Sequence, residues 1–138
     1  FFTQGFRGVA IGNFAGFRDQ SSGGIAIGDS AGNSAQGEKA VAIGYQAGRI
    51  SQASQSVAIG NRAGYSGQSF YTVAIGYSAG QNNQSQNAVA IGYDAGQNNQ
   101  ENNGIAIGIR SGENNQQDNS IAIGFQSSEI IYSGDLAA

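Results

Sequence analysis

The 138-residue sequence contains no cysteine, histidine, methionine, proline or tryptophan. Without cysteine no disulfide framework can form, and the redox compartment cannot be inferred from sulfur. Histidine and cysteine are the side chains that most often bind transition metals, so their absence predicts a chain without such a metal site. We expect no cofactor.

Charge and long apolar runs are also scarce. The chain has six basic and nine acidic residues, a net charge of −3, and no run of Lys or Arg that could neutralise phosphates. We therefore expect no nucleic-acid partner. Its apolar segments are four or five residues long, whereas a membrane-spanning helix needs about 20, so we expect no membrane span in this segment. The sequence begins FFTQ without Met, and we interpret it as part of a longer or processed chain.

One sixteen-residue unit accounts for most of what is present. The stretch 89–104 reads VAIGYDAGQNNQENNG, and its Val/Ile-Ala-Ile-Gly opening recurs, always sixteen residues apart, at Val9, Ile25, Val41, Val57, Val73, Ile105 and Ile121. A constant spacing without insertions indicates that each copy has the same place relative to its neighbour. We predict an all-β fold, a parallel β-solenoid with 16-residue coils and about eight coils. Residues 1–8 would be the second half of a preceding coil, 9–128 the repeat solenoid, and 129–138 a C-terminal cap or junction.

Each copy is numbered here from its Val or Ile as positions one to sixteen. β-branched residues at positions one and three, with Ala between them, predict a short strand with one face in a core. The predicted core residues at position three are Ile11, Ile27, Ile43, Ile59, Ile75, Ile91, Ile107 and Ile123. Positions two and sixteen hold small residues and would form a narrow strip on the opposite face, suited to close approach by another backbone or another subunit.

Position twelve holds glutamine in eight copies, namely Gln4, Gln20, Gln36, Gln52, Gln68, Gln84, Gln100 and Gln116. Equivalent residues of stacked coils lie about 4.8 Å apart, which allows side-chain amides to hydrogen-bond as a ladder. A buried amide needs partners for both its oxygen and its NH₂, and identical neighbours supply both. We predict an inward or half-buried glutamine ladder. The Asn pairs that begin at 82, 98 and 114 are interpreted as turn residues and as a further polar ladder.

Position five forms an aromatic and apolar stripe, Tyr45, Tyr77, Tyr93, Ile109 and Phe125. A sugar or protein could stack on it. The interpretation we favour is that these side chains cover the strip of small residues or meet a neighbouring subunit. The charged residues fall only at positions five, six, nine to eleven and thirteen to fifteen, and we assign those positions to solvent.

Sequence motifs for catalysis are weak. There is no histidine for a Ser-His-Asp set, and no pair of carboxylates recurs at a fixed spacing, so we expect that the protein is not an enzyme. The stretch 32–39 approximates a phosphate loop but has Glu38 where that motif requires Lys. Aspartate is sporadic, which argues against structural calcium. Only Thr3 and Thr72 are threonines, which argues against the flat threonine columns of ice-binding solenoids.

The motifs NSIAIG at 119–124 and SVAIG at 56–60 resemble the head repeats of trimeric autotransporter adhesins, the YadA-like heads of bacterial surfaces. The AIGxxAG arrays also look like those in fibre proteins of phages and large viruses. The first resemblance implies a left-handed parallel β-roll, a homotrimer and an adhesive role towards extracellular matrix such as collagen.

Two functional hypotheses follow. In the first, the chain is an extracellular adhesive fibre segment, on the cell surface or alternatively on a virion surface, that binds a matrix protein or a surface glycan through repeated surface positions. In the second, it is a structural subunit that stacks end to end into a filament, because both ends of a β-solenoid expose unpaired strand edges.

Overall fold

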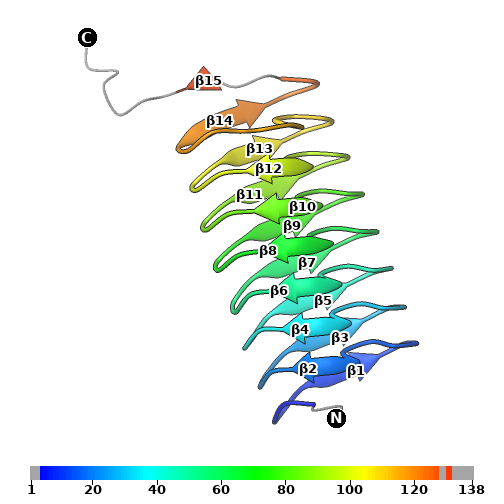
Figure 1. The fold of residues 1–138 in the computed structure, drawn as a ribbon. Helices are drawn as coiled ribbons and strands as arrows, with labels where there is room; N and C mark the ends of the chain where they lie inside the picture. The colour runs from blue at the N-terminus through cyan, green and yellow to red at the C-terminus, as the bar shows by residue number, and fades with distance from the viewer. Residues whose placement is uncertain (1–3, 128–129, 132–138) are drawn as a thin grey trace.

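The computed structural model describes residues 4–127 and 130–131, which form a parallel β-solenoid without any helix (Figure 1). Short strands alternate between two sheets that face each other along the rod. The nine-stranded sheet contains β1 (Val9–Ile11), β3 (Ile25–Ile27), β5 (Val41–Ile43), β7 (Val57–Ile59), β9 (Val73–Ile75), β11 (Val89–Ile91), β13 (Ile105–Ile107), β14 (Ser120–Ile123) and β15 (Ile130–Ile131). The six-stranded sheet contains β2 (Arg18–Gln20), β4 (Ser34–Gln36), β6 (Ile50–Gln52), β8 (Ser66–Gln68), β10 (Asn82–Gln84) and β12 (Asn98–Gln100).

The strand register equals the sequence repeat. Ala74 of β9 pairs in parallel with Ala90 of β11, and Gln84 of β10 pairs with Gln100 of β12, in each case sixteen residues on. One repeat is therefore one full coil of the backbone, and like residues lie above like. The prediction of an all-β parallel β-solenoid is confirmed, with about seven turns against the eight expected coils. The left-handed sense stays an implication of the resemblance.

The interior of the coil is narrower than the sequence suggested. From the second coil on, the alanines at positions two and seven, such as Ala74 and Ala79, are completely buried, as are Thr72 and Ala88 at position sixteen. The strip of small residues thus lines the inside of the coil and cannot be a subunit surface, so that part of the prediction was wrong. A gap that holds an alanine on one side and a glutamine on the other leaves no room for a layer of β-branched side chains.

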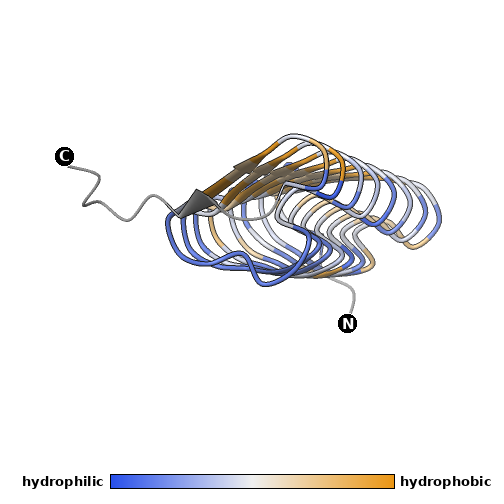
Figure 2. Cartoon of the chain, turned by 90° about the horizontal axis from the view of Figure 1, so that it is seen from above, coloured by the Kyte–Doolittle hydropathy of each residue, from blue (hydrophilic) through white to orange (hydrophobic). Residues whose placement is uncertain are grey.

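The predicted core isoleucines point the other way. Ile11 and Ile123 are 59% and 62% exposed, and the rest of position three is half-buried on the outer face of the nine-stranded sheet. The core assignment was therefore wrong for Ile11, Ile27, Ile43, Ile59, Ile75, Ile91, Ile107 and Ile123. Figure 2 shows the hydrophobic residues gathered along this sheet and hydrophilic residues along much of the rest of the coil.

Glycine at position four brings successive coils into close contact. Gly76 has φ 130°, a conformation that L residues rarely adopt. A Cβ built on Gly76 would meet the carbonyl oxygen of Gly92 in the next coil. Neighbouring coils therefore approach through bare backbone at this corner, which explains why position four is glycine in every copy.

The two ends differ. Gln4 forms a parallel bridge with Gln20, as expected if residues before Val9 belong to a preceding half-coil. At the other end β15 pairs antiparallel with β14, and Ile130 lies opposite Ile121. The other residues of the predicted cap or junction, 129 and 132–138, lie outside the described residues, as does Ser128.

Candidate functional site

The glutamines of position twelve cross the interior between the two sheets. Seven of them, from Gln20 to Gln116, are at most 2% exposed. Gln84 is typical, because its Nε2 donates to the carbonyl oxygen of Val73 at 2.9 Å, to that of Ala88 at 3.3 Å and to Oε1 of Gln100 at 3.3 Å. The amide thus joins the six-stranded sheet to the nine-stranded sheet as well as to the next coil.

The bond to the carbonyl at position one is the constant part of this arrangement, since all seven buried glutamines make it. The amide-to-amide bonds form two shorter runs, Gln20 to Gln52 and Gln68 to Gln100. Within the described residues, Oε1 of Gln20, Gln68 and Gln116 is buried without a hydrogen-bond partner. The cross-link between sheets is therefore more regular than the ladder itself.

The side chains of positions one and three form a continuous apolar surface, called here the outer Val/Ile stripe. It runs over residues 9 to 123 on the outer face of the nine-stranded sheet, and parallel register places like side chains side by side. Between the terminal coils the stripe is half-buried. Soluble monomers rarely expose a contiguous apolar surface of this extent, and such surfaces mark association sites.

The stripe at position five is also on the surface. Tyr45, Tyr77, Tyr93 and Ile109 are 46–49% exposed and Phe125 is 71% exposed. The rings of Tyr77 and Tyr93 stack at 5.0 Å with an interplanar angle of 8°. The small residues lie inside the coil, so these side chains do not cover them. The first part of the favoured interpretation, that the stripe covers the strip of small residues, was therefore wrong. Contact with a neighbouring subunit, or with a sugar, stays a prediction.

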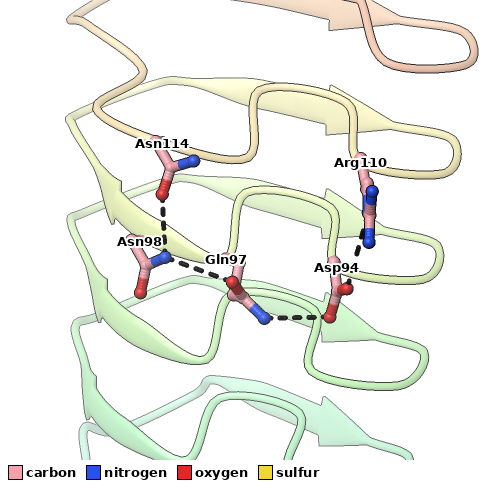
Figure 3. Close-up of polar contacts among 5 residues, drawn as sticks. All are labelled: Asp94, Gln97, Asn98, Arg110 and Asn114. Carbon is pink, nitrogen blue, oxygen red and sulfur yellow. Dashed lines mark hydrogen bonds and ion pairs between the residues drawn. The ribbon is translucent and has the colours of Figure 1, made fainter.

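One charged side chain departs from the solvent assignment. Asp94 at position six is 7% exposed, and Figure 3 shows it between Gln97 and Arg110. Its carboxylate accepts a hydrogen bond of 2.9 Å from Gln97 Nε2 and lies 4.0 Å from Arg110 Nε. Burial, followed by the negative charge of Glu113, raises the pKa of Asp94 above its ordinary value, although Arg110 and Gln97 partly oppose the shift. Asn98 extends the network by donating to Gln97 and to Asn114.

Positions six and nine contact each other in several coils, a pairing that the sequence analysis missed. Phe14 and Phe17 pack edge to face at 5.0 Å, Arg62 lies over the ring of Tyr65, and Gln97 bonds Asp94. The two positions are three residues apart and flank the Ala-Gly corner of positions seven and eight. That constant spacing around a tight corner was the available signal.

Asparagine ladders occupy the surface of the six-stranded sheet and the following turn. Asn82 donates to Asn98, Asn83 to Asn99, and Asn87 to Asn103, at 2.9 to 3.1 Å. The second residue of each predicted pair has a left-handed backbone, since Asn83 and Asn99 have φ of 55° and 54°. The pairs at 82 and 98 nevertheless lie in strands β10 and β12, so the interpretation as turn residues was wrong there. These amides make a polar surface that is distinct from the outer Val/Ile stripe.

Comparison with known families bears on this arrangement. Residues 22–47 match the model of the YadA head domain repeat, in two copies. This segment of the chain is YadA-like. The matched YadA-like segment spans strands β3 to β5, so it contains both the outer Val/Ile stripe and one buried glutamine, Gln36. No curated protein and no solved structure matches the chain.

The repeats of the family whose model residues 22–47 match belong to surface-exposed adhesins. The likeness to phage and virus fibres stays a resemblance. In the part of the chain that the structure describes, no helix is sufficiently long and apolar to span a membrane. Among those same residues no three carboxylates gather as metal ligands would.

Proposed function

We propose that this chain is a head segment of an extracellular adhesive fibre and that three copies associate through the outer Val/Ile stripe. Attachment to a matrix protein or a surface glycan would then use the polar and aromatic positions that remain exposed. The proposed role is one of binding and assembly, without catalysis. The observation that supports the assembly most strongly is the outward orientation of an apolar sheet face along the whole rod.

A second copy of the chain is the best-fitting occupant of this stripe. Every coil presents Val or Ile at position one and Ile at position three at the same register, so a copy related by rotation about an axis beside the rod and parallel to it offers an equally long apolar partner. Closed symmetric association buries such a surface completely. The number three comes from the trimeric adhesins to which YadA-like heads belong.

Mass measured by light scattering after size-exclusion chromatography tests this proposal. We expect a discrete particle of three chains whose mass does not grow with concentration. A monomer would contradict the assembly, and micrometre-long fibres in electron micrographs would favour the end-to-end filament instead.

A matched pair of variants locates the interface. Ile75→Lys places a charge in the middle of the outer Val/Ile stripe and should convert the particle to monomers, because an unpaired charge is costly to bury. Gln55→Lys adds the same charge at position fifteen, where Lys39 occurs naturally with a similar φ, and should leave the mass unchanged. Equal behaviour of the two variants would exclude this stripe as the interface.

A further inference from the structure

Arg49, Arg62 and Tyr65 form a compact cationic cluster on two adjacent coils. The guanidinium carbons of Arg49 and Arg62 lie 5.6 and 5.8 Å from the centroid of the same Tyr65 ring. Arg49 Nη1 donates to the Tyr65 hydroxyl at 2.5 Å, and Arg62 Nε donates to Gln46 Oε1 at 3.3 Å. One aromatic ring and one amide therefore hold two positive charges together.

Within the described residues, neither of these two guanidinium groups forms an ion pair. The ion pairs of the described residues join Lys39 to Glu38 and Arg110 to Asp94, and neither involves Arg49 or Arg62. The Nε of Arg49 is buried without a hydrogen-bond partner. Two guanidinium groups held near one ring repel each other, so an anionic group that contacts them would be bound favourably.

The surroundings extend the cluster along the rod. The sequence up to Arg62 holds five basic and three acidic residues, whereas the remainder holds one basic and six acidic residues. In the first coil Phe14 and Phe17 occupy the same two positions as Arg62 and Tyr65, and Arg18 lies beside the Phe17 ring at 5.8 Å. Cations and aromatic rings thus occur at or beside positions six and nine in the first, third and fourth coils, whereas the second coil has Ser30 and Asn33 there.

We propose that this surface, centred on Arg49, Arg62 and Tyr65, binds a linear acidic polysaccharide through its sulfate or carboxylate groups. The guanidinium groups would bind the anionic substituents, and the aromatic rings would pack against sugar rings. A nucleic acid also carries dense negative charge and is therefore the competing ligand that the test has to exclude. The proposal gives the adhesive role a ligand class, but it does not depend on the trimer.

Binding of the purified chain to immobilised heparin tests the proposal, with hyaluronan as the carboxylate-only probe and uncharged dextran as the blank. We expect saturable binding to heparin that weakens between about 50 and about 300 mM sodium chloride, because salt screens exposed charges. Binding to hyaluronan as tight as to heparin would assign the carboxylate as the recognised group. Binding to heparin alone would assign the sulfate.

The variants exploit residues that the repeat already accepts. Arg62→Gln places at position six the residue found at Gln46 and Gln126, and Arg49→Gln places at position nine the residue found at Gln81 and Gln97. Each change should weaken heparin binding about fivefold, and the double variant more. Arg110→Gln is the control, since it removes the same charge from position six where Asp94 is the partner. It should change affinity less than about twofold.

Three results would overturn the proposal. These are absence of heparin binding by the wild-type chain, an equal loss in Arg110→Gln, and equally tight binding of a single-stranded DNA oligonucleotide of similar charge. Unchanged circular dichroism and particle mass in each variant show that a lost affinity is not a lost fold. A trimer that fails to bind heparin would leave the proposed assembly intact, and a monomer that binds it would leave this inference intact.

Discussion

Gln84 illustrates how a polar side chain can occupy the interior of a very thin protein. Its amide reaches across the coil to the carbonyls of Val73 and Ala88 and also contacts the amide of Gln100. Burial of an amide lowers the stability of the fold when the amide has no hydrogen-bond partner, and it has little effect or is stabilising when the partners are present. The repeat supplies the same partners in every coil, so the interior can be polar without being destabilised.

Gln84→Leu should lower the stability by about 2 kcal/mol, because it removes the donor to two buried carbonyls and to the Gln100 oxygen. The melting temperature should fall correspondingly. Gln86→Leu makes the same change at an exposed position, where Phe70 already places an apolar side chain in an earlier copy, and should have little effect. A melting temperature of Gln84→Leu equal to or above that of the wild type would show that the amides do not hold the sheets together.

Asp94 contributes a pH dependence whose sign follows from its raised pKa. A raised pKa means that the folded state prefers the neutral acid. The contribution of Asp94 to the free energy of unfolding is therefore complete below the ordinary pKa of 3.8, and it is lost as the pH rises through the raised pKa. Asp94→Asn keeps a neutral acceptor for Gln97 and suits a residue with φ 52°. It should melt higher than the wild type at neutral pH.

The same variant should lose this advantage in acid, because protonated Asp94 is then neutral as well. Thermal melts of both proteins across the acidic range test the prediction. A lower melting temperature for Asp94→Asn at neutral pH would show that the Arg110 ion pair outweighs the burial of the carboxylate.

Each odd-numbered strand from β3 to β13 has a small inner face and a bulky outer face, as β11 shows. Ala90 points into the coil and is completely buried, while Val89 and Ile91 lie on the outer Val/Ile stripe. Ala90→Val should cost about 1 to 3 kcal/mol, because two added methyl groups overfill a close-packed interior. Val89→Ile enlarges the outer face by one methyl group and matches Ile25 and Ile105 at the same position, so its melting temperature should not fall. A lower melting temperature for Val89→Ile than for Ala90→Val would mean that Val89, and not Ala90, faces the interior of the coil.

The sequence was sufficient to predict these strands and their register. Constant spacing placed Ala74 above Ala90, and alternation placed Val89 and Ile91 on one face. Alternation alone does not say which face is inside, and the usual rule that bulky apolar residues are buried gave the wrong answer. Two features could have identified the inner face. Position two is always alanine, whereas position one accepts either Val or Ile. A buried Gln100 also requires a backbone carbonyl directly opposite, which only a small inner face allows.

The constant spacing of positions six and nine was visible in the sequence, but which side chains meet there depends on the geometry of the corner. Arg62 and Asp94 adopt φ of 56° and 52° although they are not glycine, and propensity gives no warning of this. The cationic cluster with Tyr65 and the buried carboxylate of Asp94 both follow from that backbone. Their positions in the sequence suggested only solvent-exposed charges.

The whole rod is held together by contacts between neighbouring coils, so its stability grows coil by coil. This construction leaves a long apolar surface on one side and polar ladders such as Asn82, Asn98 and Asn114 on the other. A chain with that distribution has one obvious surface for self-association and keeps the remaining surface for ligands. The outward orientation of the outer Val/Ile stripe is thus the feature on which the proposed assembly depends.

Single-cysteine cross-linking tests this feature most directly, because the natural chain has no cysteine and any disulfide must join two copies. Ile75→Cys lies on the outer Val/Ile stripe, and Gln55→Cys lies at position fifteen, which is not one of the two positions that form the stripe. After mild oxidation at low protein concentration, Ile75→Cys should give covalently linked chains on a denaturing gel, while Gln55→Cys should stay monomeric. Linked chains from Gln55→Cys alone, or from neither variant, would contradict an association through the outer face of the nine-stranded sheet.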